Sequence, residues 1–321
     1  MEKNREPYFD NAKFLLVFLV VFGHIIQSYI SSNEFMLNIY KFVYTFHMPA
    51  FILVSGYFSK GFNRHGYIKK ITYKLIFPYL IFQAIYTIYN HFIQDSKIKL
   101  NPFDPEWSLW FLISLFCWNL LLFLFTKIPP KLAFTVSLVI ALTVGYVDFV
   151  NHVLSLSRTL VFFPIFLAGY YLKKEHFDKI RTMKSKLTSI AMLTVVFICC
   201  LLIQFDYTWL FGSKPYSYFG EPGVISLVER LGFYCLTFVA TFSFLAIIPE
   251  KKYFFTRWGT RTLYVYLLHG FAIKFFRHSS TMEWLHNYES LLMVTLLAAV
   301  LTCLLSTTFV KKLAEPVIEL K

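Results

Sequence analysis

Ten apolar stretches, each close to the length of a membrane span, divide almost the whole chain. A transmembrane helix needs about 20 predominantly apolar residues to cross a hydrocarbon core about 30 Å thick. Of the 321 residues, 57% are hydrophobic and only 15% are charged. No connection is long enough for a second domain, so the sequence predicts a single all-α, polytopic membrane bundle of about ten transmembrane helices over residues 1–321. The predicted spans lie at about 14–31, 37–58, 71–93, 107–126, 132–150, 158–172, 186–205, 224–248, 260–277 and 288–310.

Positive charges predict the orientation of this bundle. Most of the 31 Lys and Arg residues lie in alternate connections, for example between 60 and 74 and between 173 and 186. Cytoplasmic loops carry an excess of these residues. We therefore expect both termini in the cytoplasm, the connections near 94–106 and 206–223 outside, and a multi-pass protein of the cell membrane. The net charge of +13 is then a topology signal and does not indicate nucleic-acid binding.

The cysteines predict no metal centre. All five lie inside apolar stretches, where a free cysteine packs as a small hydrophobic residue. None has the C-x-x-C or His-rich spacing that is typical of a metal site. The five are Cys117, Cys199, Cys200, Cys235 and Cys303.

Three histidines are predicted to lie near the midplane of the membrane. His24 follows Lys13 by eleven residues, which places it roughly 16 Å above that cation on a helix. His47 and His269 lie at a similar depth in the second and ninth spans. An ionisable side chain at this depth is costly, so it indicates a functional site. Because histidine takes and returns a proton near neutral pH, His24 and His47 can serve as base and partner.

Other interpretations of these histidines stay open. One buried histidine alone is more often a hydrogen-bonding residue packed between helices. A histidine pair can also relay protons in a transporter that carries out no chemistry. Zinc binding would need further ligands, and no carboxylate or cysteine has ligand spacing near the three histidines.

A second set of polar residues is predicted near the outer face of the membrane. Arg230 and its neighbour Glu229 could form an intramembrane ion pair, and Arg158 could extend to the interface. The two arginines could instead line an outer vestibule that holds a hydroxylated or anionic acceptor. Trp110 lies at a similar level, where it could stack on a sugar or anchor its helix.

The opening residues Asp10, Lys13 and His24, followed by the run Phe46-His47-Met48-Pro49, resemble the two leading motifs of the integral-membrane acyltransferase 3 family. Later segments are similar to that family too: LWFL at 109–112, FPIFLAGY at 163–170 and YLLH at 266–269. The resemblance covers nearly the whole chain, and its opening is closest to a branch similar to fucose 4-O-acetylases. Many members have arginine at the position of Lys13. In this chain the compact ammonium of lysine therefore replaces a guanidinium, which can donate two parallel hydrogen bonds.

The resemblance implies that the first-helix cation and histidine, here Lys13 and His24, are essential, and the predicted positions of the other candidates suggest their roles. The family moves acyl groups from cytoplasmic acyl-CoA to hydroxyls on glycans or other acceptors outside. Lys13 and Asp10 would then bind the donor, and His24 would act as general base or as a transient acyl carrier. His47 would orient His24 or complete the proton path, and replacement of His269 should be milder because its motif match is the weakest. The outer residues Arg158, Arg230 and Trp110 would contact the acceptor, with Glu229 secondary.

We therefore expect a membrane-embedded O-acyltransferase, in the simplest case an O-acetyltransferase. Its donor substrate would be acyl-CoA, its acceptor a carbohydrate and its surroundings the lipid bilayer, with no separate cofactor. The alternative is a proton-coupled multi-pass transporter that uses the midplane histidines as a relay. Solute uptake that needs no acyl-CoA would distinguish the transporter from the enzyme.

Overall fold

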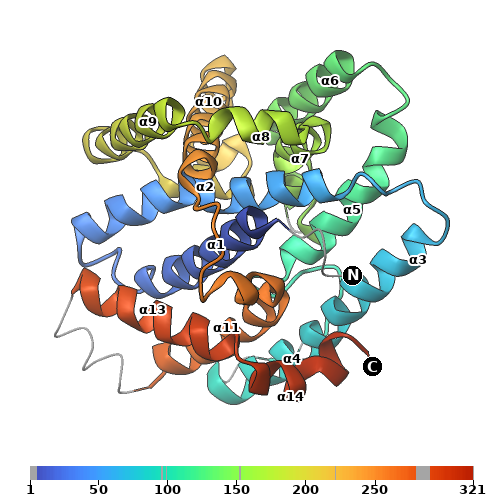
Figure 1. Ribbon diagram of the computed structural model, residues 1–321, viewed down its shortest axis with the longest axis vertical. Coiled ribbons are helices and arrows are strands. Elements are labelled where there is room, and N and C mark those ends of the chain that lie inside the picture. The colour runs from blue at the N-terminus through green and yellow to red at the C-terminus, as the bar shows by residue number, and fades with distance from the viewer. Residues whose placement is uncertain are drawn as a thin grey trace.

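The chain folds into a bundle of helices (Figure 1). The computed structural model describes residues 6–94, 97–98, 100–151, 153–220, 222–279 and 290–320. Every regular element in these ranges is a helix, which confirms the predicted all-α class. The predicted start of the last span, at 288 and 289, and positions 95, 96, 99 and 221 of the predicted outer connections lie outside the described residues.

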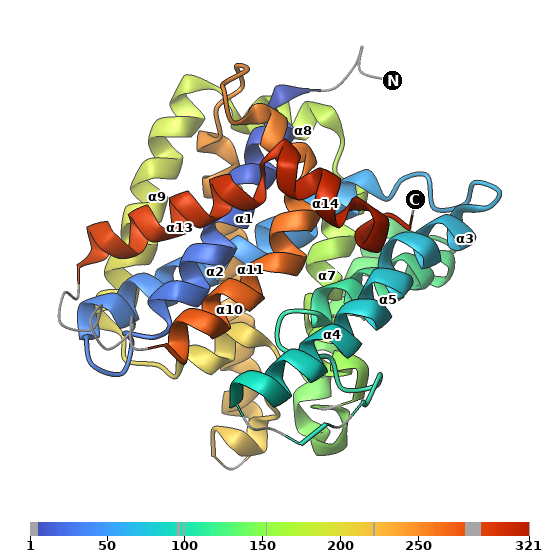
Figure 2. The same cartoon turned by 90° about the horizontal axis from the view of Figure 1, so that it is seen from below.

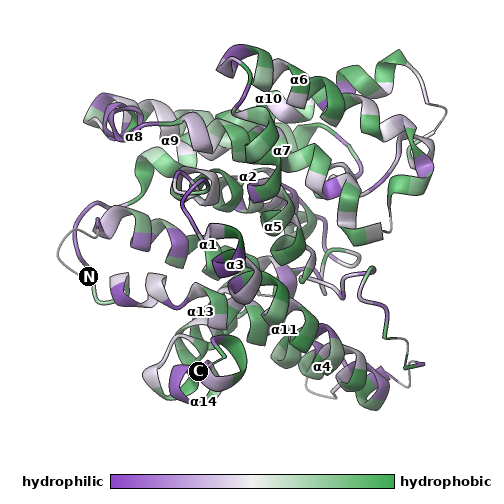
Figure 3. Ribbon diagram, turned by 90° about the vertical axis from the view of Figure 1, so that its right-hand side faces the viewer, coloured by the Kyte–Doolittle hydropathy of each residue, from purple (hydrophilic) through white to green (hydrophobic). Residues whose placement is uncertain are grey.

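Each of the ten predicted apolar stretches contains one of the longer helices, whereas α8 and most of α3 and α14 lie outside these stretches. Hydrophobic residues run along the long helices, whereas α8 and several connections are hydrophilic (Figure 3). A π-helical turn, Thr72–Ile76, joins α3 to α4. In chain order the helices are α1 (Pro7–Ile26), α2 (Glu34–Phe58), α3 (Tyr67–Ile71), α4 (Phe77–Gln94), α5 (Trp110–Phe125), α6 (Pro130–Thr143), α7 (Leu156–Tyr171), α8 (Lys174–Ile180), α9 (Met183–Leu202), α10 (Val224–Ile247), α11 (Thr262–Arg277), α13 (Leu291–Leu305) and α14 (Thr308–Ile318).

The structure does not confirm the count of ten spans. Among the described residues, five helical segments are long and apolar enough to cross a membrane alone. Others are shorter: α5 and α7 have 16 residues each, or about 24 Å of helix against a hydrocarbon core of about 30 Å. The last predicted span is broken, because α13 and α14 meet at an angle of 64° (Figure 2). The five long segments are Pro7–Ile26, Glu34–Phe58, Tyr67–Gln94, Met183–Leu202 and Val224–Ile247.

We call the side of the bundle at which α1 begins, at Pro7, the N-terminal face. Several other helices begin or end there. Lys186 Nζ, near the start of α9, lies 2.9 Å from Glu250 Oε1, just after the end of α10. Arg261, before the start of α11, donates a hydrogen bond of 2.7 Å to the carbonyl of Ser306, just after α13. The start of one helix thus lies beside the end of another, as the alternating charge pattern predicts.

Contacts at the other end of the bundle, the opposite face, complete this alternation. Arg277, the last residue of α11, donates a hydrogen bond of 2.6 Å to the carbonyl of His24, near the end of α1.

The C-terminal end of the described chain is held by the start of α11. The hydroxyl of Tyr264, in the first turn of α11, donates to Glu319 at 2.7 Å. The C-terminal end of the described chain therefore lies at the N-terminal face.

Helix α1 lies near the centre of the bundle, packed against α2, α11 and α13 (Figure 1). Within its most apolar stretch 72% of the residues are buried by the protein, compared with 17% in α9. Side chains such as Leu16, Val17 and Val21 are almost fully enclosed. Because the protein and not lipid surrounds α1, this helix can carry polar side chains at membrane depth.

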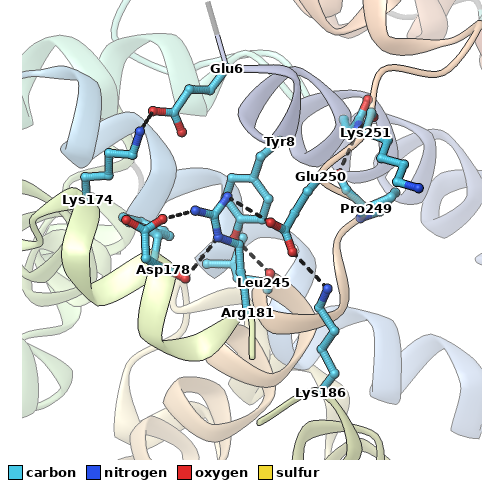
Figure 4. A network of polar contacts seen from close by, with 12 residues as sticks. Glu6, Tyr8, Lys174, Asp178, Arg181, Lys186, Leu245, Pro249, Glu250 and Lys251 are labelled. Atoms are coloured by element: carbon cyan, nitrogen blue, oxygen red, sulfur yellow. Dashed lines mark hydrogen bonds and ion pairs between the residues drawn. The ribbon is translucent and has the colours of Figure 1, made fainter. Parts of the chain in front are cut away.

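Polar contacts hold the start of α1 in place at the N-terminal face (Figure 4). The hydroxyl of Tyr8 donates to the carbonyl of Leu245 at 2.8 Å, and the Arg181 guanidinium lies 4.6 Å from the centre of the Tyr8 ring. Glu250 accepts a hydrogen bond from Lys186 at 2.9 Å. This bond lowers the pKa of the Glu250 carboxyl from its usual value. The network ties α1 to α8, α9 and the end of α10.

Helices α2 and α7 cross in direct backbone contact. A Cβ atom at Gly56 would overlap the carbonyl oxygen of Phe166, and one at Gly169 would overlap that of Leu53. Small residues allow two membrane helices to approach closely. The crossing positions α2, which carries His47, against α7, which carries Arg158.

The orientation predicted from charge can be tested by labelling. In a variant whose five native cysteines are replaced by alanine, Lys97→Cys and Tyr218→Cys should react with a membrane-impermeant thiol reagent in intact cells. Both native side chains are exposed and lie near the opposite face. Arg64→Cys and Lys179→Cys should react only after the membrane is opened, and the reverse result would contradict the predicted orientation.

Candidate active site

A cavity of about 150 Å³ lies between α1, α2, α7 and the start of α5. It brings together four residues predicted from the sequence, namely His24, His47, Arg158 and Trp110. We call it the histidine cavity. Much of the remaining lining is aromatic, from Tyr40, Tyr44, Trp107, Phe162, Phe211 and Tyr266.

Arg277 secures the end of α1 that carries His24. Its guanidinium donates to the carbonyl of His24 at 2.6 Å, to Gln27 Oε1 at 3.0 Å and to Ser28 Oγ at 3.1 Å. The last carbonyls of a helix lack partners within it, and a cation there also interacts favourably with the helix dipole. Arg277 therefore fixes the last turn of α1 and the position of His24.

His47 and His269 are each held by a carbonyl one turn earlier in the same helix. His47 Nδ1 lies 2.9 Å from the oxygen of Val43, and His269 Nδ1 lies 3.0 Å from that of Val265. A carbonyl oxygen only accepts, so both Nδ1 atoms carry a proton. In the neutral rings, each Nε2 atom is then a hydrogen-bond acceptor. Within the described residues, no three His, Cys, Asp or Glu side chains are grouped to hold one metal ion.

Trp107, which the sequence analysis did not single out, packs against two of the histidines. Its ring centre lies 4.3 Å from that of His24 and 5.2 Å from that of His269. The backbone of Trp107 has φ +44, a left-handed conformation that costs about 1 to 3 kcal/mol in a residue with a side chain. A Cβ atom at Gly270 would overlap the indole, so the glycine leaves room for it. No sequence spacing relates Trp107 to His24, because they come from separate segments.

A buried polar network supports the segment that contains Trp107. Lys274 Nζ on α11 donates to Asn90 Oδ1 on α4 at 2.7 Å. Asn90 in turn donates to Glu106 Oε2 at 2.9 Å, and the backbone N–H of Glu106 donates to Gln83 Oε1 at 2.9 Å. Lys274 Nζ also lies 5.6 Å from the centre of the Trp107 ring. The network joins α4 and α11 around the strained residue.

A second cavity, of about 640 Å³, lies closer to the N-terminal face, and we call it the Lys13 cavity. Lys13 and Asp10 both line it, and Lys13 Nζ lies 2.7 Å from Asp10 Oδ1. Lys74, on the π-helical turn between α3 and α4, adds another cation to the lining. Turns of this type often occur at functional sites.

The histidine and Lys13 cavities lie end to end. On α2, Met48 lines the histidine cavity and Phe51, about one turn later, lines the Lys13 cavity. On α1, Val20 and Lys13 line the same two cavities in that order. Seven residues of helix separate Val20 from Lys13, a rise of about 10 Å. On α2 the two cavities therefore come within about one helical turn of each other, at Met48 and Phe51.

A third cavity, of about 610 Å³, adjoins the histidine cavity on the side of the opposite face, and we call it the outer cavity. Arg158 and Phe211 line both. The Arg158 guanidinium lies 5.0 Å from the centre of the Trp110 ring, but no described residue forms a hydrogen bond or ion pair with it. Phe162 also packs on Trp110, at 5.8 Å between ring centres. Trp110 thus supports Arg158 and is itself partly covered.

Arg230 and Glu229 are not brought to these cavities. Arg230 is 5% exposed and donates to the carbonyls of Ala141 and Lys214 at 3.4 Å and 3.1 Å. Its guanidinium lies 4.4 Å from the centre of the Tyr216 ring. The Glu229 side chain is exposed. Among the described residues, Arg230 therefore joins segments of the opposite face and does not line any cavity described above.

Comparison with known proteins identifies the family of this chain. The sequence model of the acyltransferase 3 family, described as an acyltransferase domain, matches residues 6–311. Nodulation protein NolL of Sinorhizobium fredii (strain NBRC 101917 / NGR234) is 27% identical over 235 residues, which are 67% of this chain and 60% of that protein. Nodulation protein NolL of Mesorhizobium japonicum is 46% identical over 61 residues, which are 18% of this chain and 16% of that protein. No solved structure matches the chain significantly.

Arg230 and Arg158 are held by different contacts, so their replacement should affect the stability of the protein differently. Arg230→Gln should lower the free energy of unfolding by about 1 to 3 kcal/mol, because it removes a buried donor from two carbonyls. Arg158→Gln should cost less than about 1 kcal/mol, since it removes a cation–π contact alone. Thermal unfolding of the purified proteins in detergent would measure both. Equal losses would contradict the structural role of Arg230.

Proposed function

The chain belongs to the acyltransferase 3 family, and we propose that it is a membrane-embedded O-acyltransferase. It moves an acyl group, in the simplest case acetyl, from cytoplasmic acyl-CoA to a hydroxyl of an extracytoplasmic carbohydrate. The observation that carries this proposal is the position of the histidine cavity between the Lys13 cavity and the outer cavity. Two substrates that cannot cross the membrane could approach the same base from opposite sides.

The Lys13 cavity supports a donor site at the cytoplasmic end. CoA carries phosphates that are costly to move into hydrocarbon, and Lys13 and Lys74 supply positive charge at the mouth. The ion pair with Asp10 orients the Lys13 ammonium. From there the slender pantetheine arm would pass Phe51 and reach His24, roughly 16 Å above Lys13.

The outer cavity supports an acceptor site. Arg158 lies where this cavity meets the histidine cavity, and its guanidinium has no acidic partner among the described residues. The guanidinium can donate hydrogen bonds to oxygens of the substrate that receives the acyl group. It can also donate to the thioester carbonyl oxygen, which becomes negative during transfer. Serine hydroxyls, Asp104 and Lys214 are also part of the lining of this cavity. Such groups suit the dense hydroxyls of a carbohydrate.

The proposed reaction is a direct transfer with His24 as general base. His24 takes the proton of the acceptor hydroxyl, and the oxygen attacks the thioester carbonyl carbon. The carbon–sulfur bond then breaks, and the leaving thiolate takes the proton from the His24 imidazolium. The products are the acyl ester and free CoA, and His24 is neutral again. His47 lines the same cavity and completes the proton path.

Replacement of the base should abolish transfer without removing the protein from the membrane. We expect His24→Ala to lower the rate about 10² to 10⁴-fold, the usual contribution of a general base, and His47→Ala also to be severe. Labelled acyl-CoA and purified protein in vesicles would show both acceptor labelling and release of free CoA.

His65→Ala provides a matched control, because His65 is exposed near the N-terminal face, away from the histidine cavity. It should keep full activity. Full activity in His24→Ala would contradict the mechanism. Uptake of a solute by wild-type vesicles without any need for acyl-CoA would favour the transporter instead.

The donor assignment predicts a difference between two acyl donors. Lys13→Met should weaken the use of acyl-CoA much more than that of a short acyl-pantetheine analogue, because only the former carries nucleotide phosphates. Lys13→Arg should keep substantial activity. Measurement of KM for each donor would test this, and equal losses for both donors would mean that Lys13 serves only to anchor its helix.

A further inference from the structure

Two adjacent histidine rings each contain a buried nitrogen that lacks a partner. His24 Nδ1 and His269 Nε2 are both enclosed, and no described residue forms a hydrogen bond with either atom. The His269 side chain is 0% exposed. A buried polar atom without a partner costs about 1 to 3 kcal/mol. Two such atoms in neighbouring rings therefore call for a common explanation.

The separation of the two rings suits a hydrogen bond between them. Their centres are 5.4 Å apart, with an angle of 33° between the ring planes. Each ring nitrogen lies about 1.1 Å from its ring centre, so about 3 Å would remain between two nitrogens that face each other, which is a hydrogen-bond distance. A small rotation of the His24 ring about its terminal torsion, which has a broad energy minimum, would align them.

The hydrogen bond of His269 determines which ring must donate. His269 Nδ1 donates to the carbonyl of Val265 at 3.0 Å, so its Nε2 is an acceptor in the neutral ring. The donor must then be His24 Nδ1–H. A neutral His24 with its proton on Nδ1 has its lone pair on Nε2, which is the form that a general base requires.

We infer that His269 is the positioning residue that holds His24 in its basic tautomer. The chain of hydrogen bonds runs from His24 Nδ1–H to His269 Nε2, and from His269 Nδ1–H to the carbonyl of Val265. His24 Nε2 then takes the proton of the acceptor hydroxyl, while His269 stabilises the imidazolium that forms. This inference rests on the proposed function, and it assigns to His269 the orienting role that the sequence analysis gave to His47.

Trp107 gives this arrangement a second, independent support. Its indole packs at 4.3 Å and 5.2 Å from the centres of the two rings. Exclusion of water strengthens a hydrogen bond in the interior and keeps the tautomer fixed. A conformation as costly as the positive φ of Trp107 persists only where the surrounding structure holds it, and such strain clusters at active sites.

Two amide replacements of His269 test the inference. The side-chain oxygen of glutamine can reach the position of the lost Nε2 atom, whereas that of asparagine reaches only the position of Nδ1. We expect His269→Gln to keep kcat within about tenfold of wild type and His269→Asn to lower it about 10²-fold. KM for acyl-CoA should stay within about twofold in both, because His269 does not line the cavities.

His278, the residue that directly follows α11, offers a matched control. Its Nδ1 also bonds the carbonyl one turn earlier, at 2.9 Å from Lys274, but it lies beyond the end of α11 and is exposed. His278→Asn should leave kcat unchanged. Equal kcat values in His269→Gln and His269→Asn would overturn the positioning role. A wild-type protein that transfers no acyl group would contradict the proposed function itself.

A spectroscopic readout tests the tautomer without any turnover. In protein with ¹⁵N-labelled histidine, the His24 signals can be identified by their absence in His24→Gln. We expect wild-type His24 to carry its proton on Nδ1, and a mixture of tautomers to arise in His269→Asn. An unchanged His24 spectrum in His269→Asn would overturn the inference.

Discussion

Polar groups buried in an apolar bundle have to find their partners within the protein, and this requirement organises the structure around α1. At one end Tyr8 bonds the carbonyl of Leu245, and at the other Arg277 bonds the carbonyl of His24. Between these ends the helix is enclosed by α2, α11 and α13. The result is a rigid, protein-lined helix that can hold an imidazole at membrane depth.

The cavities extend this arrangement toward both faces of the bundle. The Lys13 cavity and the outer cavity approach the same small space from opposite ends, and on α2 the first of them comes within about one turn of the histidine cavity, at Phe51 and Met48. This geometry suits the function proposed above, in which the two substrates stay on opposite sides of a membrane.

Much of the local structure could be predicted from the sequence, whereas several contacts between distant residues could not. Among the described residues each predicted apolar stretch contains a helix, and His24, His47, Arg158 and Trp110 do line one cavity. The predicted count of ten spans is not confirmed, because short helices and the break after α13 depart from the simple length rule. The orientation in the membrane and the roles of the site residues stay predictions, to be tested by labelling and kinetics.

The sequence by itself determined the helical class and the positions of the apolar helices along the chain, because these follow from hydrophobic length and from a fixed rise per residue. Only the tertiary structure decided that His24 lies beside Trp107 and His269 and that Arg230 bonds carbonyls away from the cavities. Such neighbours depend on how each helix is rotated and packed against the others. That rotation results from contacts such as the crossing of α2 and α7 at Gly56 and Gly169, which join residues more than a hundred positions apart.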